Sequence, residues 1–269
     1  MITQREISKR AFQAGKQDRV IEKDYVITWL LLGIPDSSLA ELLAFKGGTA
    51  LKKAYFEDYR FSEDIDFTIL GDADDANLLG SLAEVTERLA SDVGLIFRID
   101  EARVERRHGS LTAYVDFVGP LRGALGSRDI KVDFTFDEMI VFPLSTCRVI
   151  SRYSDSENLC KDIRVYSLEE ILVEKMCALI GRTEPRDLYD AHLLLSLGDL
   201  DHESVLEGFS AKAEKKGIDP TRLLDVLRER EPTIARLWRN RLALQVDDLP
   251  HLERVLRETR RAIRKMGLK

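Results

Sequence analysis

Two aspartates, Asp64 and Asp66, are separated by one apolar residue in the segment SEDIDFTIL. Alternate residues of a strand face the same side, so a strand here places both carboxylates on one face and Ile65 and Phe67 on the other. Two carboxylates at this spacing can bind a divalent cation, because Mg²⁺ prefers hard oxygen ligands together with substrate phosphates. An isolated Asp-x-Asp is more often a solvated strand face, so the pair needs a second signal.

The second signal is the turn just upstream, where Gly47 and Gly48 precede Thr49 and a run of good helix formers. Glycines before a helix let the backbone approach a phosphate, and the first helical turn offers N–H donors and the positive end of the helix dipole. We predict that these residues and Lys46 bind phosphates while the aspartates hold the metal. A Gly-Gly pair alone is more often a plain turn, and the GxxxxGK[ST] spacing of a P-loop is missing.

A third carboxylate would complete a metal-dependent transfer site. The segment DIKVDFTFDE alternates so that Phe134 and Phe136 face the core and Asp133 shares the polar face with Lys131. Asp116, in LTAYVDFVG, lies in a similar alternation. We prefer Asp133, and the alternation by itself does not exclude Asp116.

A lysine gives an independent signal. Lys175 falls inside the apolar stripe of the helix predicted for YSLEEILVEKMCALIGR. A buried lysine is costly unless it has a partner or lines a cavity, although a lysine can also reach solvent along a domain seam. Asp187 and Asp190, three residues apart on the next helix, are candidate partners for Lys175 or for Arg186. For the two aspartates, structural ion pairing is the simpler interpretation.

The apolar periodicity predicts the elements that position these residues. Helices are expected within residues 3–33 and over residues 78–93. Four segments alternate as strands do and are separated by turn residues, namely LIFRID, LTAYVDFVG, DIKVDFTF and CRVISRY. The segment SLAELLAF fits a helix or a strand.

From about Ser167 the pattern is helical almost to the end of the chain. Ser167 and Glu170 form a capping-box pattern, and two or three helices are expected within residues 201–267. We therefore predict an α+β protein with two domains. Residues 1–160 form the N-terminal helices and the α+β domain, and residues 161–269 form a helical domain.

Composition restricts the class of protein. The 269 residues are 44% hydrophobic and 33% charged, and no apolar run approaches the roughly 20 residues that span a bilayer. The polar N-terminus lacks the apolar core of a signal peptide. The three cysteines lack metal-ligand spacing, so we expect buried reduced thiols, a cytoplasmic protein and no membrane partner.

The charge of −6 excludes a generally basic coat but leaves local patches. The last twenty residues, PHLERVLRETRRAIRKMGLK, contain seven Arg or Lys and two Glu, whereas residues 58–75 are rich in aspartate. An acidic locus with basic flanks suits a metal-dependent site that acts on a polyanion. On charge alone, a solvated helix and an acidic loop fit equally well.

Several motifs in order resemble one family. The segments VIEKDYVITWLL, AFKGGTALKKAY, RFSEDIDF, EKMCAL and RDLYDAHLL resemble the AbiEii-type abortive-infection nucleotidyltransferase toxins, which include the mycobacterial MenT toxins. The resemblance covers roughly residues 18–195. It implies a polymerase-β-like nucleotidyltransferase core with a mixed sheet and an added C-terminal helical region. No family motif matches beyond about residue 200.

The resemblance also assigns residues. The family's glycine turn and Asp-x-Asp fall on Gly47, Gly48, Thr49, Asp64 and Asp66. Thr49 stands where many members carry serine, which keeps the hydroxyl. The family's later lysine and aspartate match Lys175, which would neutralise phosphate charge, and Asp187, which would orient the lysine or contact the nucleotide. Asp133 remains an inference from spacing.

The function implied is that of a toxin in a toxin–antitoxin or phage abortive-infection system. Such an enzyme takes a nucleoside triphosphate as donor and uses two Mg²⁺, which Asp64, Asp66 and, by our inference from spacing, Asp133 would hold here. Its expected acceptor is the tRNA 3′ end. The expected partner is a cognate antitoxin, often a winged-helix DNA-binding protein. The alternatives are a nucleotidyltransferase acting on a protein or an aminoglycoside-like acceptor, and a non-catalytic nucleotide-binding protein.

Overall fold

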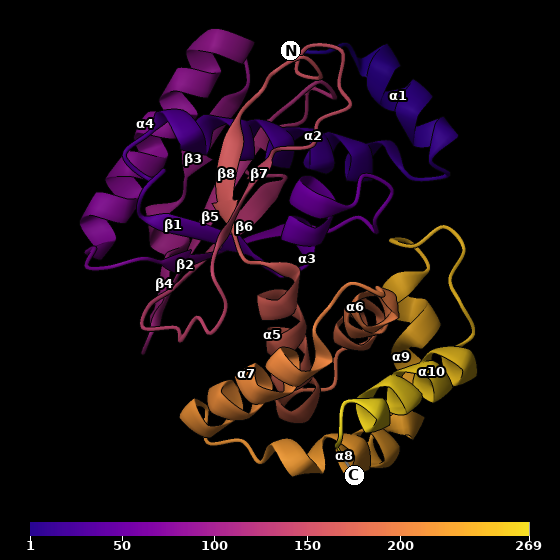
Figure 1. Cartoon of the computed structure of the whole chain (residues 1–269). Helices are drawn as coiled ribbons and strands as arrows, with labels where there is room; N and C mark the ends of the chain where they lie inside the picture. Colours follow the sequence, from indigo (N-terminus) through magenta and orange to yellow (C-terminus); the bar gives the residue numbers. More distant parts are fainter. Residues whose placement is uncertain (269) are drawn as a thin grey trace. The chain divides into compact units, whose positions relative to one another are not determined.

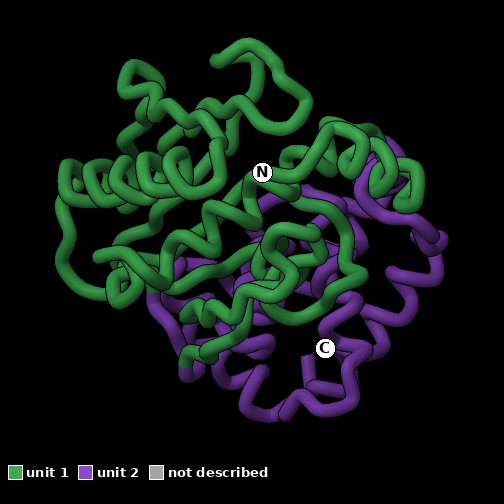
Figure 2. The backbone as a smooth tube through the Cα atoms, turned by 90° about the horizontal axis from the view of Figure 1, so that it is seen from above, with its two compact units in different colours: residues 1–138, 144–165 green, residues 139–143, 166–269 purple. Residues whose placement is uncertain are grey.

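A computed structural model of the protein describes residues 1–268, which form two compact units (Figure 1, Figure 2). The first unit contains residues 1–138 and 144–165. The second contains residues 139–143 and the chain from Tyr166 onward. The backbone therefore passes between the units at residues 138–139, again at 143–144 and again at 165–166.

The first unit is built on a sheet that has eight strands within the described residues. The strands are β1 (Leu43–Lys46), β2 (Asp64–Ile69), β3 (Ile96–Ile99), β4 (Glu105–Arg107), β5 (Ser110–Val118), β6 (Asp129–Thr135), β7 (Ser145–Arg148) and β8 (Asp162–Val165). Their order is β3-β5-β6-β2-β1-β8-β7, with β4 paired to β5. Strand β2 runs parallel to β6 and β1 runs parallel to β8, whereas the other pairs are antiparallel. The sheet is mixed, as predicted.

Helices accompany this sheet in the first unit. They are α1 (Gln4–Gln13), α2 (Asp18–Gly33), α3 (Gly47–Ala50) and α4 (Asp75–Val93), with short helical turns η1 (Ile34–Asp36), η2 (Leu51–Tyr55) and η3 (Glu101–Arg103). Helices α2 and α4 approach each other closely, because a Cβ atom at Gly33 would lie 2.7 Å from Val85 Cγ1. Helix α4 also contacts β3. The helices predicted within residues 3–33 and over residues 78–93 are confirmed.

A buried polar cluster fixes α2 to the turn that follows α3. The Nζ atom of Lys53 donates hydrogen bonds to Asp24 at 2.7 Å and to Thr28 at 2.8 Å, and the Tyr153 hydroxyl donates to Asp24 at 2.8 Å. Burial, the largest influence, raises the pKa of Asp24. The ammonium groups of Lys53 and Lys52 and the hydrogen bonds outweigh burial, so the net pKa is below its ordinary value. Asp24 is therefore held as a carboxylate.

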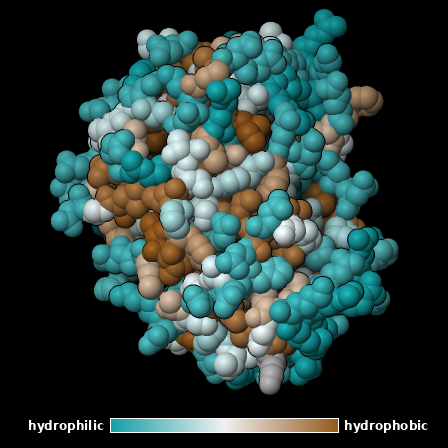
Figure 3. All heavy atoms as spheres, viewed as in Figure 1, coloured by the Kyte–Doolittle hydropathy of each residue, from teal (hydrophilic) through white to brown (hydrophobic). Residues whose placement is uncertain are grey.

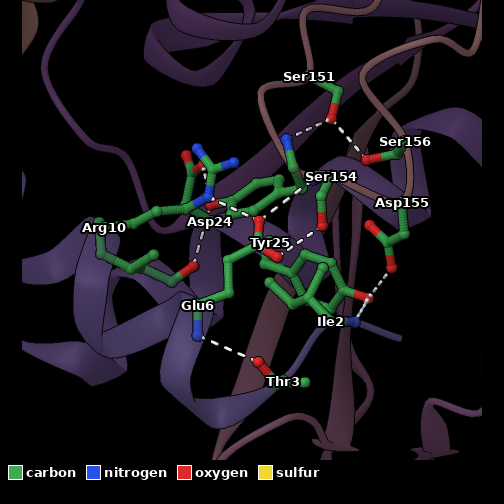
Figure 4. A network of polar contacts seen from close by, with 12 residues as sticks. Ile2, Thr3, Glu6, Arg10, Asp24, Tyr25, Ser151, Ser154, Asp155 and Ser156 are labelled. Atoms are coloured by element: carbon green, nitrogen blue, oxygen red, sulfur yellow. Dashed lines mark hydrogen bonds and ion pairs between the residues drawn. The ribbon is translucent and has the colours of Figure 1, made fainter.

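The N-terminal helices also bond to the segment 151–156. In Figure 4, Glu6 from α1 accepts hydrogen bonds from Ser154, and the Tyr25 hydroxyl from α2 donates to Asp155 at 2.8 Å. The backbone N–H of Ile2 donates to the same hydroxyl at 3.3 Å. These contacts tie the start of the chain to the loop between β7 and β8.

The second unit is helical. Its helices are α5 (Leu168–Gly181), α6 (Pro185–Ser196), α7 (His202–Lys215), η4 (Pro220–Arg222), α8 (Leu223–Glu229), α9 (Glu231–Leu242) and α10 (Leu252–Lys265). Four α-helices follow residue 201 in the described part of the chain, so the expectation of two or three is wrong. Within residues 1–268, no helix combines the length and apolar character that a bilayer crossing requires. Hydrophilic side chains cover most of the face drawn in Figure 3, with hydrophobic ones in patches among them.

The segment Met139–Pro143 is bound into the second unit by its backbone. The Glu170 carboxylate, which is fully buried, accepts the N–H groups of Val141 and Phe142, each at 2.8 Å. The same carboxylate forms an ion pair with Lys212, which is also fully buried. A buried charge pair of this kind is costly to break, so it fixes the segment to α5 and α7.

The Ser167 cap is confirmed only in one direction. The Ser167 hydroxyl accepts the N–H of Glu170 at 3.2 Å, as a capping box requires. The reciprocal half is wrong, because the Glu170 side chain bonds to Val141, Phe142 and Lys212 instead.

Three local expectations also change. SLAELLAF forms turns and then β1, and β8 was not predicted because DIRV is a short and polar strand. CRVISRY leaves the ladder after Arg148, because the N–H of Ile150 bonds to the Lys53 carbonyl at 2.7 Å. Cys177 is a buried cysteine, as expected, but Cys147 is half-buried and Cys160 is exposed.

Candidate functional site

The strand register places the predicted carboxylates on one polar face of the first unit. Asp66 on β2 lies opposite Asp133 on β6, and Asp64 lies opposite Lys131. Directly paired residues on adjacent strands share a face, so Asp64, Asp66 and Asp133 point to the same side. On the other face Phe67, like its neighbours along both strands, is buried. Alternation predicted this division for each strand, and the register adds that the strands are neighbours.

The polar face of β6 is already internally bonded. The Thr112 hydroxyl on β5 donates to Asp133 Oδ1 at 2.5 Å, and Lys131 Nζ donates to Asp133 Oδ2 at 2.5 Å. Burial, the largest influence, lowers the pKa of Lys131. The hydrogen bond and charge of Asp133, with the charges of Asp64 and Asp66, outweigh burial and raise the pKa above its ordinary value. The ammonium group thus interacts favourably with all three carboxylates.

The rival carboxylate lies further along the sheet. Asp116 is opposite Asp129 on β6, four positions along β5 from the residue that pairs with Asp133. It is 1% exposed and forms ion pairs with Arg98 at 2.5 Å and Arg103 at 3.5 Å. The geometry therefore places Asp133, and not Asp116, beside Asp66.

The glycine turn approaches the Asp66 carboxylate directly. Gly47 has a φ of 81°, and a Cβ atom built on it would lie 3.2 Å from Asp66 Cγ. A side chain at this position would strain the backbone and collide with the carboxylate. Lys46, which pairs with Asp66 across β1 and β2, is buried, and its Nζ lies 3.9 Å from Glu138 Oε2. The turn and the acidic pair form one local structure.

Thr49 has a role that the sequence did not indicate. Its hydroxyl is buried and donates a short hydrogen bond to the backbone carbonyl of Asp64. The bond joins the start of α3 to the start of β2. Thr49 thereby positions the acidic strand relative to the glycine turn.

Two buried cations beside the turn were missed. A Cβ atom on Gly48 would lie 3.2 Å from Arg60 Cζ, and the Arg60 side chain is only 4% exposed. Lys52 donates to the Tyr59 carbonyl at 2.9 Å and lies 4.2 Å from the centre of the Phe61 ring. Burial lowers the pKa of Lys52. The available signal in the sequence was the position of Arg60 within the RFSEDIDF motif.

The donor chemistry of this face fits Mg²⁺. Carboxylate oxygens are the ligands that this ion prefers, and the ammonium of Lys131 is a stand-in cation on the same carboxylates. Within residues 1–268, however, no three His, Cys, Asp or Glu side chains are gathered closely enough to hold a metal. Asp64, Asp66 and Asp133, which would hold the ion, are in register, but their side chains are not gathered into one cluster.

The predicted lysine and aspartate meet in the second unit. Lys175 is 8% exposed, and its Nζ lies 2.9 Å from Asp187 and 2.8 Å from Asp190. Asp187 also accepts a hydrogen bond from Arg182 at 2.7 Å, so the second partner is Arg182 and not Arg186. Burial, the largest influence, raises the pKa of Asp187, but Lys175 and Arg182 outweigh it and lower the net pKa. Lys175 is thus a buried and paired lysine, as its position in the apolar stripe required.

Replacement of Asp187 by asparagine should destabilise the helical unit. The variant leaves Lys175 with one carboxylate fewer in a buried site, so we expect the free energy of unfolding to fall by about 2–3 kcal/mol at pH 7. Because the folded pKa of Asp187 is depressed, its contribution is fully present above about pH 4 and is lost as the pH falls through the folded value. Thermal unfolding from pH 7 to pH 2.5 should show the gap between wild type and variant closing below about pH 4.

The matched control is Asp199→Asn, at an exposed position between α6 and α7. It should change the free energy of unfolding by less than about 0.5 kcal/mol at each pH. A gap for Asp187→Asn that stays constant through the acid range would contradict the ion-pair explanation.

Comparisons with known proteins bear on the family and the fold. The family model described as "Nucleotidyl transferase AbiEii toxin, Type IV TA system" matches residues 29–262. The chain is similar to MenT4, a nucleotidyltransferase toxin from Mycobacterium tuberculosis H37Rv, with a TM-score of 0.69 and 18% identity, covering 99% of this chain and 90% of that one. It is also similar to JHP933 from Helicobacter pylori, with a TM-score of 0.60 and 18% identity, covering 93% of each chain. No curated protein sequence matches. The likeness to MenT4 confirms the predicted nucleotidyltransferase fold.

Proposed function

The chain belongs to the AbiEii family of nucleotidyl transferase toxins, and on this premise we propose that it transfers a nucleotide from a nucleoside triphosphate to the 3′ end of a tRNA. Family membership makes the protein a nucleotidyltransferase and implies a cognate antitoxin. The observation that carries the proposal is the register of β2 and β6, which sets Asp66 opposite Asp133 beside the glycine turn.

In the proposed reaction the carboxylates and the turn have separate tasks. Asp64, Asp66 and Asp133 would hold Mg²⁺, which supplies charge neutralisation on the triphosphate and activation of the acceptor hydroxyl. The N–H groups of Gly47 and Gly48 would bind phosphate oxygens, since no side chain at either position blocks the approach. Thr49 keeps this turn fixed to β2 through its bond to the Asp64 carbonyl.

Two buried cations of the first unit would complete its phosphate site. Lys46 and Arg60 lie next to the turn, where their charges favour a polyphosphate. Lys175 would neutralise phosphate charge, and Asp187, which bonds to its ammonium group, would orient it.

The basic face of α10 supports RNA as the acceptor. Arg257, Arg261 and Arg264 are exposed at helical spacing, and none of them forms an ion pair with another of residues 1–268. Guanidinium groups on one face of a helix suit the phosphates of a nucleic-acid backbone. A cytoplasmic location and a winged-helix antitoxin are part of the same proposal.

The experiment that tests the proposal supplies each α-labelled nucleoside triphosphate separately, with Mg²⁺ and total tRNA. We expect label on tRNA with one nucleotide and no label with Mg²⁺ removed. Label on the protein, or on an aminoglycoside supplied in place of tRNA, would show that the acceptor is not tRNA. Nucleotide binding without transfer to any acceptor would contradict the proposal.

Replacement of Gly47 by alanine should distinguish the effect of a collision with Asp66 from the effect of backbone strain alone. The new Cβ would displace the Asp66 carboxylate, so we expect transfer to fall about a hundred-fold, the effect of misplacing a reacting group by roughly 1 Å. Gly71→Ala is the matched control, because Gly71 has a φ of 100° but a Cβ atom added to it would meet no other atom within 4 Å. Both variants should lose about 1–3 kcal/mol of stability, and only Gly47→Ala should lose transfer. Equal activity in the two variants would show that the approach to Asp66 has no role.

A further inference from the structure

Asp133 has no oxygen that is not already bonded within the first unit. Its Oδ1 accepts from Thr112 and its Oδ2 accepts from Lys131, each at 2.5 Å. A divalent cation that binds Oδ2 would be repelled by the ammonium group on the same oxygen, so its binding is favoured when the ammonium group moves away. Asp64, Asp66 and Asp133 are in register, but within residues 1–268 they do not form a compact metal cluster.

Lys131 is placed to serve all three carboxylates. It lies directly opposite Asp64 in the β2–β6 pair, and it is two residues from Asp133 on the same face of β6. Its side chain is 38% exposed, so the ammonium group has room to move toward solvent while the strand stays in place. The Thr112 side chain is short, so its hydroxyl cannot move away from Asp133 Oδ1 in the same way.

We propose that Lys131 is a positioning residue that acts as a resident counter-ion: its ammonium group holds Asp133 while the site is empty of metal and is displaced from Oδ2 when a divalent cation binds. The inference rests on the proposed metal-dependent transfer and adds a regulation of that site. Lys131 would lower the affinity for the free ion, so that the carboxylates do not gather around a metal before the nucleotide brings further charge.

The test measures Mn²⁺ binding without nucleotide, by the electron paramagnetic resonance signal of the free ion. Lys131→Met keeps the length of the side chain and removes its charge, so its affinity for Mn²⁺ should rise about ten-fold, the order expected for one unit charge at a half-exposed site. The matched control is Lys161→Met. Lys161 is 35% exposed and pairs with Asp36 at 2.8 Å in the same unit, and its loss should leave the affinity unchanged.

The coupling to Asp133 is tested in a double-variant cycle. In a protein that already carries Asp133→Asn, Lys131→Met should no longer raise the affinity for Mn²⁺, because the two residues act on the same oxygen. Lys131→Met could bind Mn²⁺ as wild type does or more weakly, while Asp66→Asn abolishes the binding. That result would overturn the counter-ion role of Lys131 and would still support the metal site. No Mn²⁺ binding by wild type or Lys131→Met, even with nucleotide present, would overturn both the counter-ion and the proposed function.

Discussion

Replacement of Asp66 by asparagine is expected to lower nucleotide transfer by at least about a thousand-fold, equivalent to roughly 4 kcal/mol of transition-state stabilisation. Asp66 is the central carboxylate of the polar face, since it pairs with Lys46 on one side and with Asp133 on the other. Its carboxylate also lies against Gly47, where the phosphates are proposed to bind. The amide keeps the shape of the side chain and removes the charge, so the loss should fall on the chemistry.

The measurement is single-turnover transfer of label to tRNA, together with thermal unfolding to show that the variant is folded. Asp72→Asn is the matched control, because it makes the same change of charge at an exposed position shortly after β2. It should transfer label at the wild-type rate. Transfer by Asp66→Asn within ten-fold of wild type would remove the carboxylate face from the proposed reaction.

The second large effect distinguishes the two candidates for the third carboxylate. Asp133→Asn should reduce transfer by about a hundred-fold or more with little loss of stability, because Asp133 is half-buried and its partner Lys131 is half-exposed. Asp116→Asn should behave in the opposite way. It weakens a buried carboxylate's bonds to Arg98 and Arg103, so the free energy of unfolding should fall by about 1–3 kcal/mol while each folded molecule keeps its activity.

Both variants are to be measured in the same transfer and unfolding assays, with the activity expressed per folded molecule. A variant pair in which Asp116→Asn loses transfer and Asp133→Asn keeps it would exchange the roles of the two residues. Each variant serves as the control for the other, because both remove one charge from the same face of adjacent strands.

The sequence predicted much of this arrangement because side-chain alternation is a local property. The division of β2 into a carboxylate face and an apolar face follows from the types of its own residues, as does the burial of Lys175 in an apolar helical stripe. Phe134 is buried as predicted, but Phe136 lies beyond the end of β6 and is half-buried. The alternation held only as far as the strand did.

The pairing of strands is a non-local property, and the choice between Asp133 and Asp116 depended on it. Both residues alternate correctly, and only the register shows that Asp133 is opposite Asp66 while Asp116 is opposite Asp129. The same reason explains why the contacts of Arg60 and Thr49 were not predicted. Their partners, Gly48 and the Asp64 carbonyl, are set by the fold of the turn onto β2 and not by residue type.

The segment Met139–Pro143 has a consequence for the order in which the chain folds during its synthesis. Its hydrogen-bond acceptor Glu170 and the lysine that neutralises that acceptor, Lys212, are both translated after it. Phe142 packs against Gly208, where a Cβ atom would lie 3.0 Å from the ring Cζ. Until α7 has left the ribosome, this segment has been made but lacks part of its binding site, so a chain arrested before α7 cannot complete the helical unit. The helical unit therefore finishes folding only after the ribosome has translated the chain well beyond the carboxylates of the first unit.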